Sequence, residues 1–100
     1  AHHLLRIEVE CDTLAQVREA LDAQAEAILL DNMAPDDLRA AVAVIRAARP
    51  ATIIEASGGI GTDPAQIRAV ADTGVDLISI GALTHSAANL DLSLEFTTSE

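Results

Sequence analysis

The stretch AILLDNMAPDDLRAAVAVIRAARPATIIEASGG, residues 27–59, predicts one complete strand–helix–strand unit. An apolar run over residues 27–30 favours a buried strand, and a turn follows it at Asp31-Asn32. Pro35 opens the helix, because proline is tolerated in the first helical turn, and Pro50 ends it. A second apolar strand then begins. Continuous apolar strands separated by a single helix are typical of a parallel sheet covered by helices.

The same unit occurs upstream of this stretch. Residues 4–10 predict a strand, and the apolar residues then follow a helical period from Leu14 to Leu21. Asp12 or Thr13 can cap that helix, with Gln16 placed to complete a capping box.

Downstream, a third helix is expected to begin near Asp63-Pro64 and to end at Gly74. Residues 75–80 predict a fourth strand, which leads into a loop at residues 81–86. Four strands with three helices between them define an α/β protein. Periodicity alone leaves two architectures open, a (β/α) barrel and a doubly wound sheet.

The end of the chain has a different pattern. Apolar and polar side chains alternate over residues 90–96, which predicts a half-buried strand. It has no helix and no hairpin mate in the sequence, so we expect it to pair with a sheet formed by residues absent from this chain. A complete eight-unit barrel takes about 250 residues. We therefore expect the 100-residue chain to be too short for a whole barrel enzyme.

The composition argues against several classes of protein. A formal net charge of −10 and a single aromatic residue, Phe96, argue against nucleic-acid binding. No apolar run approaches the roughly 20 residues of a membrane-spanning helix. Cys11 is the only cysteine, which excludes an internal disulfide and favours the cytoplasm. We expect its side chain to be an ordinary apolar core group.

Polar residues follow each predicted strand. Glu10 and Asp31 come directly after apolar strand residues, and the carboxyl ends of parallel strands meet at one edge of a sheet. Taken singly, each carboxylate is explained as a helix cap or a solvated loop residue. Taken together, they predict two oxygen ligands at one mouth, where they could hold Mg²⁺ through water or accept hydrogen bonds from sugar hydroxyls.

Two glycine turns suggest an anion site at the same mouth. Ser57-Gly58-Gly59 offers backbone N–H groups with no Cβ in the way, ahead of a helix whose dipole favours an anion. Gly81 begins a second such segment, in which Thr84, His85 and Ser86 add side-chain donors. Barrels often bind one phosphate between their last two βα loops. The plainer alternatives are a turn glycine at position 81 and a satisfied loop histidine at position 85.

Two further expectations concern the third strand and the basic residues. Glu55 lies two residues before Ser57 and points to the same side, where it either accepts from an active-site group or pairs within the barrel. Ile53 is expected in the core. The six basic residues are expected on solvated surfaces: Arg6, Arg18, Arg39, Arg46, Arg49 and Arg68.

The succession of these motifs resembles the C-terminal part of quinolinate phosphoribosyltransferase, also called nicotinate-nucleotide pyrophosphorylase (carboxylating). The resemblance covers nearly the whole chain, in order and with matching spacing. It rests on Glu8-Val9-Glu10, Leu29-Leu30-Asp31-Asn32, Glu55-Ala56-Ser57-Gly58-Gly59-Ile60, Thr73-Gly74-Val75-Asp76 and Gly81-Ala82-Leu83-Thr84-His85-Ser86.

The resemblance implies a fold, an activity and an assembly. Residues 1–88 would form part of an open (β/α) barrel, and the strand in residues 89–100 would return to an N-terminal sandwich domain. The family is a Mg²⁺-dependent pentosyltransferase of NAD biosynthesis. It converts quinolinate and phosphoribosyl pyrophosphate to nicotinate mononucleotide, pyrophosphate and CO₂, and it works as a homodimer or larger homo-oligomer.

The resemblance also implies roles for individual residues. Glu10 and Asp31 would be catalytic and would take the ribose hydroxyls and the metal. The substrate-binding set would comprise Glu10, Asp31, Glu55, Ser57, Gly58, Gly59, Gly81 and His85. The basic cluster that binds quinolinate in the family lies upstream of this segment, so the isolated chain is expected to be inactive. Two rivals stay open: another phosphate-binding βα-barrel enzyme, and a non-catalytic fragment that self-associates through its open strand edges.

Overall fold

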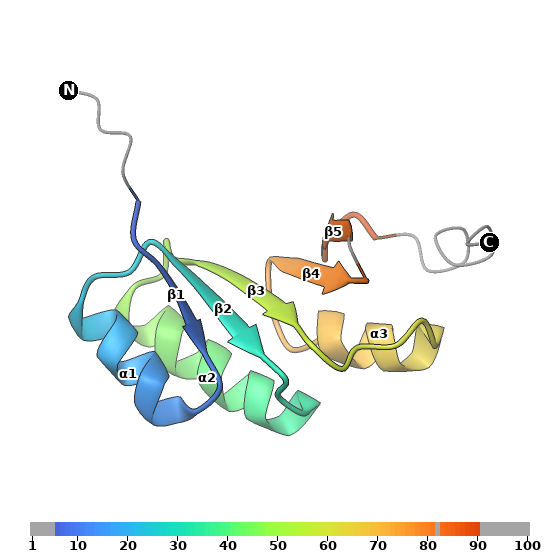
Figure 1. Ribbon diagram of the computed structural model, residues 1–100, viewed down its shortest axis with the longest axis horizontal. Helices are drawn as coiled ribbons and strands as arrows, with labels where there is room; N and C mark the ends of the chain where they lie inside the picture. Colours follow the sequence, from blue (N-terminus) through green and yellow to red (C-terminus); the bar gives the residue numbers. More distant parts are fainter. Residues whose placement is uncertain (1–5, 82, 91–100) are drawn as a thin grey trace.

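The computed structural model describes residues 6–81 and 83–90 as a sheet with helices packed on it (Figure 1). The elements, in chain order, are β1 Glu8–Cys11, α1 Leu14–Asp22, β2 Ala27–Asp31, α2 Pro35–Ala48, β3 Ile53–Ser57, α3 Pro64–Ala71, β4 Leu77–Ile80 and β5 Leu83–Ser86. The strands lie in the order β1-β2-β3-β4-β5, with β1 to β4 parallel. The predicted α/β class with parallel βα units is therefore confirmed.

The helices begin where the capping residues indicate. Gln16 N donates to Thr13 Oγ1 over 3.2 Å, and Gln16 Oε1 accepts from the backbone N–H of Thr13, so the expected capping box is present. Asp63 caps α3, and proline occupies the first turn of both α2 and α3. Side-chain caps thus define the starts of α1 and α3, and α2 has no side-chain cap but begins with Pro35.

The two faces of the sheet have different surroundings. All three helices lie on one face (Figure 1), and the strand side chains that point toward them form the core. Ile28, Ile54 and Ile78 are each exposed by 1% or less. On the other face, no helix of the described ranges covers the strands. Ile53, which we expected in the core, points to this open face and is 40% exposed. Strand alternation therefore places Ile54 in the core and turns Ile53 to the open face.

Residues 81–86, expected to be a loop, contain β5. Ile80 pairs with Leu83, so only two residues separate two antiparallel strands. The first of these residues, Gly81, has a φ of +61°. Two-residue hairpins require such positive φ values, which glycine adopts without strain. The sheet is therefore mixed at its β5 edge. The alternating strand expected over residues 90–96 falls almost wholly outside the described residues.

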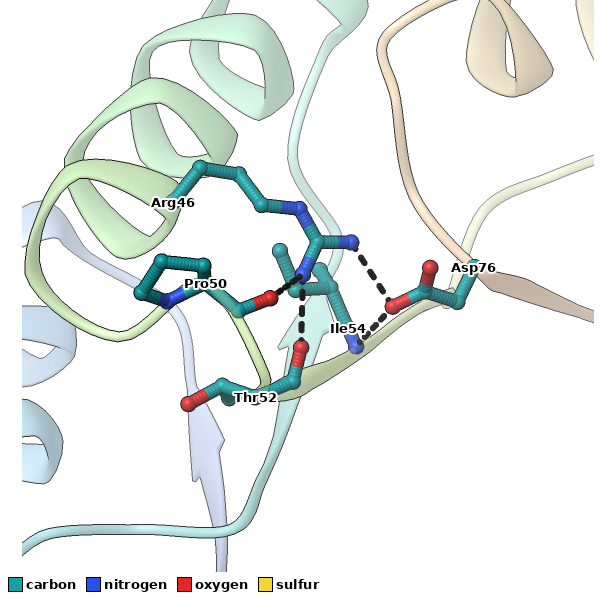
Figure 2. A network of polar contacts seen from close by, with 5 residues as sticks. All are labelled: Arg46, Pro50, Thr52, Ile54 and Asp76. Carbon is teal, nitrogen blue, oxygen red and sulfur yellow. Dashed lines mark hydrogen bonds and ion pairs between the residues drawn. The ribbon is translucent and has the colours of Figure 1, made fainter.

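Arg46, which we expected to be solvated, instead joins α2, β3 and β4 (Figure 2). Its Nη1 donates to the carbonyl oxygens of Pro50 and Thr52 at 3.0 and 2.7 Å, and its Nη2 donates to Asp76 Oδ2 at 2.8 Å. The same Oδ2 accepts from Ile54 N at 2.8 Å. One guanidinium thus satisfies carbonyl groups at the start of β3 and a carboxylate before β4, at the end of the sheet opposite Asp31.

Cys11 confirms the expectation of an apolar core group. Its side chain is fully buried and free. Burial, with smaller contributions from Asp12, Glu19 and Glu10, raises the pKa of the thiol. The thiol therefore stays protonated at neutral pH and is a poor nucleophile. Among the described helices, none is long and apolar enough to cross a membrane.

Arg46→Met should lower the free energy of unfolding by about 1–3 kcal/mol, because two carbonyl oxygens and the Asp76 carboxylate lose their hydrogen bonds from the guanidinium. The matched control is Arg39→Met. Arg39 pairs with Asp36, which lies three residues earlier in α2, and both side chains are largely exposed. This control should stay within about 0.5 kcal/mol of the wild type. Urea denaturation of both variants measures the difference, and equal losses would contradict the bridging role of Arg46.

Ile54→Ala should cost about 2–5 kcal/mol, since it opens a cavity in a fully buried site. Ile53→Ala in the same chain should cost roughly half of this or less, because that side chain is partly in water already. Thermal denaturation followed by circular dichroism tests the ranking. A larger loss for the alanine at position 53 would mean that another segment covers the open face.

Candidate active site on the open face of the sheet

The strand register gathers most of the expected site residues on the open face. Glu10, Leu29, Glu55 and Leu77 form one row across β1 to β4. Asp31 and Ser57 lie further along their strands on the same face. With strands about 4.8 Å apart and two residues spanning about 6.7 Å, the Cα atoms of Glu10 and Asp31 are separated diagonally by roughly 8 Å. The two residues therefore lie on the same face of the sheet, on adjacent strands.

The end of β2 and the turn after β3 form one packed unit. Ser57 Oγ donates to Asp31 Oδ1 at 3.3 Å, and Asn32 N donates to the carbonyl oxygen of Ser57 at 2.8 Å. A Cβ at Gly58 would collide with Asp31 Oδ1 and lie only 3.0 Å from Asn32 N. Gly58 and Gly59 have φ values of +80° and +66°. Glycine is thus required at position 58 by both conformation and space.

Asn32 is a site residue to which the sequence pattern assigns no role of its own. It is one of two described non-glycine residues with positive φ, at 60°. Its Oδ1 would lie 3.0 Å from a Cβ at Gly59, so its side chain packs against the glycine turn. Asparagine tolerates this conformation better than most residues do. An asparagine directly after a strand-end aspartate is therefore a signal that this tight turn is needed.

Any anion held at the glycine turn would be bound by the backbone of the turn itself. Helix α3 begins only at Pro64, and its N-cap, Asp63, already accepts from Ala65 N at 3.1 Å. A carboxylate thus occupies the helix N-terminus that we expected to support an anion. Successive backbone N–H groups in turns with positive φ can form a small concave anion site by themselves. This leaves the Gly58-Gly59 turn as the relevant donor.

Gly81 and His85 lie at the β4–β5 edge of the sheet, Gly81 between the two strands and His85 in β5. The turn at Gly81 is open, and a Cβ added there would meet no atom within 4 Å. His85 pairs with Ile78, whose side chain is buried toward the helices. Paired residues in an antiparallel ladder point to the same side. The register therefore turns His85 away from the face that carries Asp31 and Ser57, and its phosphate-binding role stays a prediction.

Glu55 has partners that the sequence does not reveal. Ser79 Oγ on β4 donates to Glu55 Oε2, and Ser79 Oγ lies 2.9 Å from Thr84 Oγ1 on β5. The sequence pattern places Ser79 within an apolar strand, and it does not predict the antiparallel pairing that brings Thr84 to it. Beside this group the open face is hollowed by a cavity of about 190 Å³, lined in part by Leu29, Glu55 and Leu77.

The donor set on the open face suits a weakly held divalent cation. Among residues 6–81 and 83–90, no group of three or more His, Cys, Asp or Glu side chains could hold a metal ion. Glu10 and Asp31 thus offer two carboxylates at most. Mg²⁺ typically keeps several waters and is bound by one or two carboxylates together with substrate phosphates. Two carboxylates supplemented by water are a donor set that could hold Mg²⁺.

The fold and the strand-end site define the chain as part of a (β/α)-barrel-type domain. Residues 1–95 match the family model described as quinolinate phosphoribosyl transferase, C-terminal domain. The chain belongs to this family.

Named relatives and a solved structure agree with the family match. The human nicotinate-nucleotide pyrophosphorylase [carboxylating] is 38% identical over 100 residues, which is all of this chain and 33% of the relative. A probable enzyme of the same name from Bacillus subtilis is 44% identical over 99% of the chain and 32% of its own length. The crystal structure of the Ehrlichia chaffeensis nicotinate-nucleotide pyrophosphorylase superposes with a TM-score of 0.64 at 37% identity, covering 75% of this chain and 26% of that one. The chain thus spans about a third of its curated relatives.

Gly58→Ala should destabilise the chain about twice as much as Gly81→Ala. Both residues have positive φ, which costs an alanine about 1–2 kcal/mol. Only at position 58 does the new Cβ also meet the Asp31 carboxylate and the backbone of Asn32. Chemical denaturation of the two variants measures the difference. Equal losses would show that the contact between Asp31 and the glycine turn is loose.

Proposed function

We propose that the chain carries the phosphoribosyl-donor half of the active site of a carboxylating nicotinate-nucleotide pyrophosphorylase. The reaction joins quinolinate to the ribosyl group of phosphoribosyl pyrophosphate and yields nicotinate mononucleotide, pyrophosphate and CO₂. One observation carries the proposal: in a chain of this family, the Asp31 carboxylate and the Ser57-Gly58-Gly59 turn are packed into one unit on the open face of the sheet.

Each part of this unit has a role that follows from its chemistry. The N–H groups of the Gly58-Gly59 turn suit the 5′-phosphate of the donor. Glu10 and Asp31 suit the ribose hydroxyls, since carboxylates accept hydrogen bonds strongly. Ser57 donates to Asp31, and this bond orients the carboxylate in the absence of substrate. The turn and the carboxylates together would hold the phosphate and the sugar in one fixed orientation.

Charge explains why carboxylates suit this reaction. Positive charge develops at the ribosyl carbon as pyrophosphate leaves, and fixed negative groups nearby stabilise it. Mg²⁺, when bound, would neutralise the leaving pyrophosphate. The residues that would hold it are Glu10 and Asp31. The loss of CO₂ that follows asks mainly for a site that keeps the pyridine ring in place.

The acceptor half of the site is proposed to come from residues outside this chain. Quinolinate is a dianion and requires several cations. Of the six arginines, all within the described ranges, Arg6 alone lines the cavity on the open face. Arg46 is engaged with carbonyl oxygens and Asp76. The complete enzyme is further proposed to be a cytoplasmic homodimer or larger homo-oligomer.

Calorimetric titration of this chain with phosphoribosyl pyrophosphate and Mg²⁺ tests the proposal. We expect binding of the donor and none of quinolinate titrated alone. Asp31→Asn should weaken donor binding at least about 10-fold, because the carboxylate that faces the sugar and the metal loses its charge. Asp72→Asn makes the same change of charge at the exposed end of α3 and should have no effect. Equal weakening by both variants would contradict a local role for Asp31.

A further inference from the structure

Three side chains on three neighbouring strands form a continuous hydrogen-bonded relay on the open face. Glu55 lies on β3, Ser79 on β4 and Thr84 on β5. Ser79 Oγ contacts Glu55 Oε2 on one side and Thr84 Oγ1, at 2.9 Å, on the other. The relay exists only because β5 turns back along β4 and places Thr84 opposite Ser79.

The chemistry of the groups fixes the direction of the relay. An ionised carboxylate only accepts hydrogen bonds, so the single hydroxyl hydrogen of Ser79 goes to Glu55. Ser79 can then only accept from Thr84, which must donate its own hydroxyl hydrogen. Successive hydroxyl bonds polarise each other and strengthen the bond to the terminal carboxylate. The arrangement therefore holds the Glu55 carboxylate in one orientation.

The relay lies on the same face of the sheet as Glu10, Asp31 and Ser57. Glu55 shares a row with Glu10 across Leu29, and it lies two residues before Ser57 on the same face. A sugar whose phosphate is held at the Gly58-Gly59 turn, and whose hydroxyls face Glu10 and Asp31, lies over this row. Ser79 bonds to Oε2 of Glu55, so in this arrangement the sugar would meet the second carboxylate oxygen.

We propose that Ser79, supported by Thr84, is a positioning residue that holds Glu55 against the ribosyl carbon during phosphoribosyl transfer. This inference rests on the proposed function. The bond between the ribosyl carbon and pyrophosphate breaks, and its electron pair leaves with pyrophosphate. The lone pair of the quinolinate ring nitrogen forms the new bond. No proton passes through the relay, because Glu55 acts by its charge while the bond to pyrophosphate lengthens.

The role predicts a particular kinetic pattern in the complete enzyme. Ser79→Ala should lower kcat about 10- to 100-fold, the size of effect seen when a group that orients a functional ligand is removed. The KM for phosphoribosyl pyrophosphate should change less than about threefold, because the phosphate turn and Asp31 remain intact. Ser79→Thr keeps the hydroxyl and suits a strand, so it should restore most of kcat. Thr84→Val should lower kcat less than Ser79→Ala does. Glu55→Gln should lower kcat at least as much as Ser79→Ala does.

A matched control separates positioning from stability. Ile67→Val on α3 removes one methylene from a fully buried site on the helix side of the sheet. It should lower the melting temperature modestly and leave kcat unchanged. If Ser79→Ala is destabilised to the same extent yet keeps its kcat, the relay is structural and the inference is wrong. The inference is equally wrong if Ser79→Thr fails to restore kcat although it folds.

Failure of the underlying function gives a different result. A wild-type enzyme that releases no pyrophosphate from phosphoribosyl pyrophosphate and quinolinate overturns both the proposed function and this inference. An active wild type in which Asp31→Asn is impaired while Glu55→Gln and Ser79→Ala are not overturns the inference alone. Pyrophosphate release measured for all variants at saturating quinolinate distinguishes these outcomes.

Discussion

The parallel register between β2 and β3 places Asp31 opposite Ser57, and the rest of the site depends on this alignment. A slip of one residue would turn every side chain of the slipped strand to the other face, moving Asp31 (in β2) or Glu55 (in β3) into the helix-covered core. Such a slip is prevented by Ile28, Leu30 and Ile54, whose burial requires the observed alignment. The apolar residues that stabilise one face thereby fix the positions of the polar residues on the other.

The sheet divides stability and chemistry between its two faces and its two ends. The helix-covered face holds the core, and Arg46 with Asp76 ties α2, β3 and β4 together at the end opposite the site (Figure 2). The open face carries the carboxylates, the glycine turn and the relay. The backbone at the site is conformationally constrained, because Asn32 and Gly58 both adopt positive φ and their turns pack against each other. The hydrogen bonds of Arg46 and Asp76 at one end of the sheet help to stabilise the fold, which can then tolerate the constrained turns at Asn32 and Gly58 at the other end.

Local signals in the sequence are sufficient for the elements and for part of the site. Continuous apolar runs, Thr13 with Gln16, and the prolines predict strands and helix starts, because these effects act within a few residues. The shared face of Glu10, Asp31 and Ser57 follows from strand alternation. Features that require partners distant in the sequence are missed. In the sequence Arg46 has the pattern of a solvated helix residue, and only the structure shows its contact with Asp76. Ser79 likewise has the pattern of one residue in an apolar strand, and only the pairing of β4 with β5 shows its contact with Thr84.

Electrostatics links the acidic composition to the way in which this face would receive its ligand. The chain has a net charge of −10, and Glu10, Asp31 and Glu55 add negative charge locally. A pyrophosphate-bearing sugar is itself strongly anionic, so the bare face would repel it over a Debye length of about 8–10 Å. The backbone N–H groups of the glycine turn offset only the charge of one phosphate. A divalent cation carried by the pyrophosphate would convert the same carboxylates from a repulsive to an attractive surface. Under the proposed function, the negative charge that would stabilise a developing ribosyl cation would be compatible with binding only if the donor arrived as a metal complex.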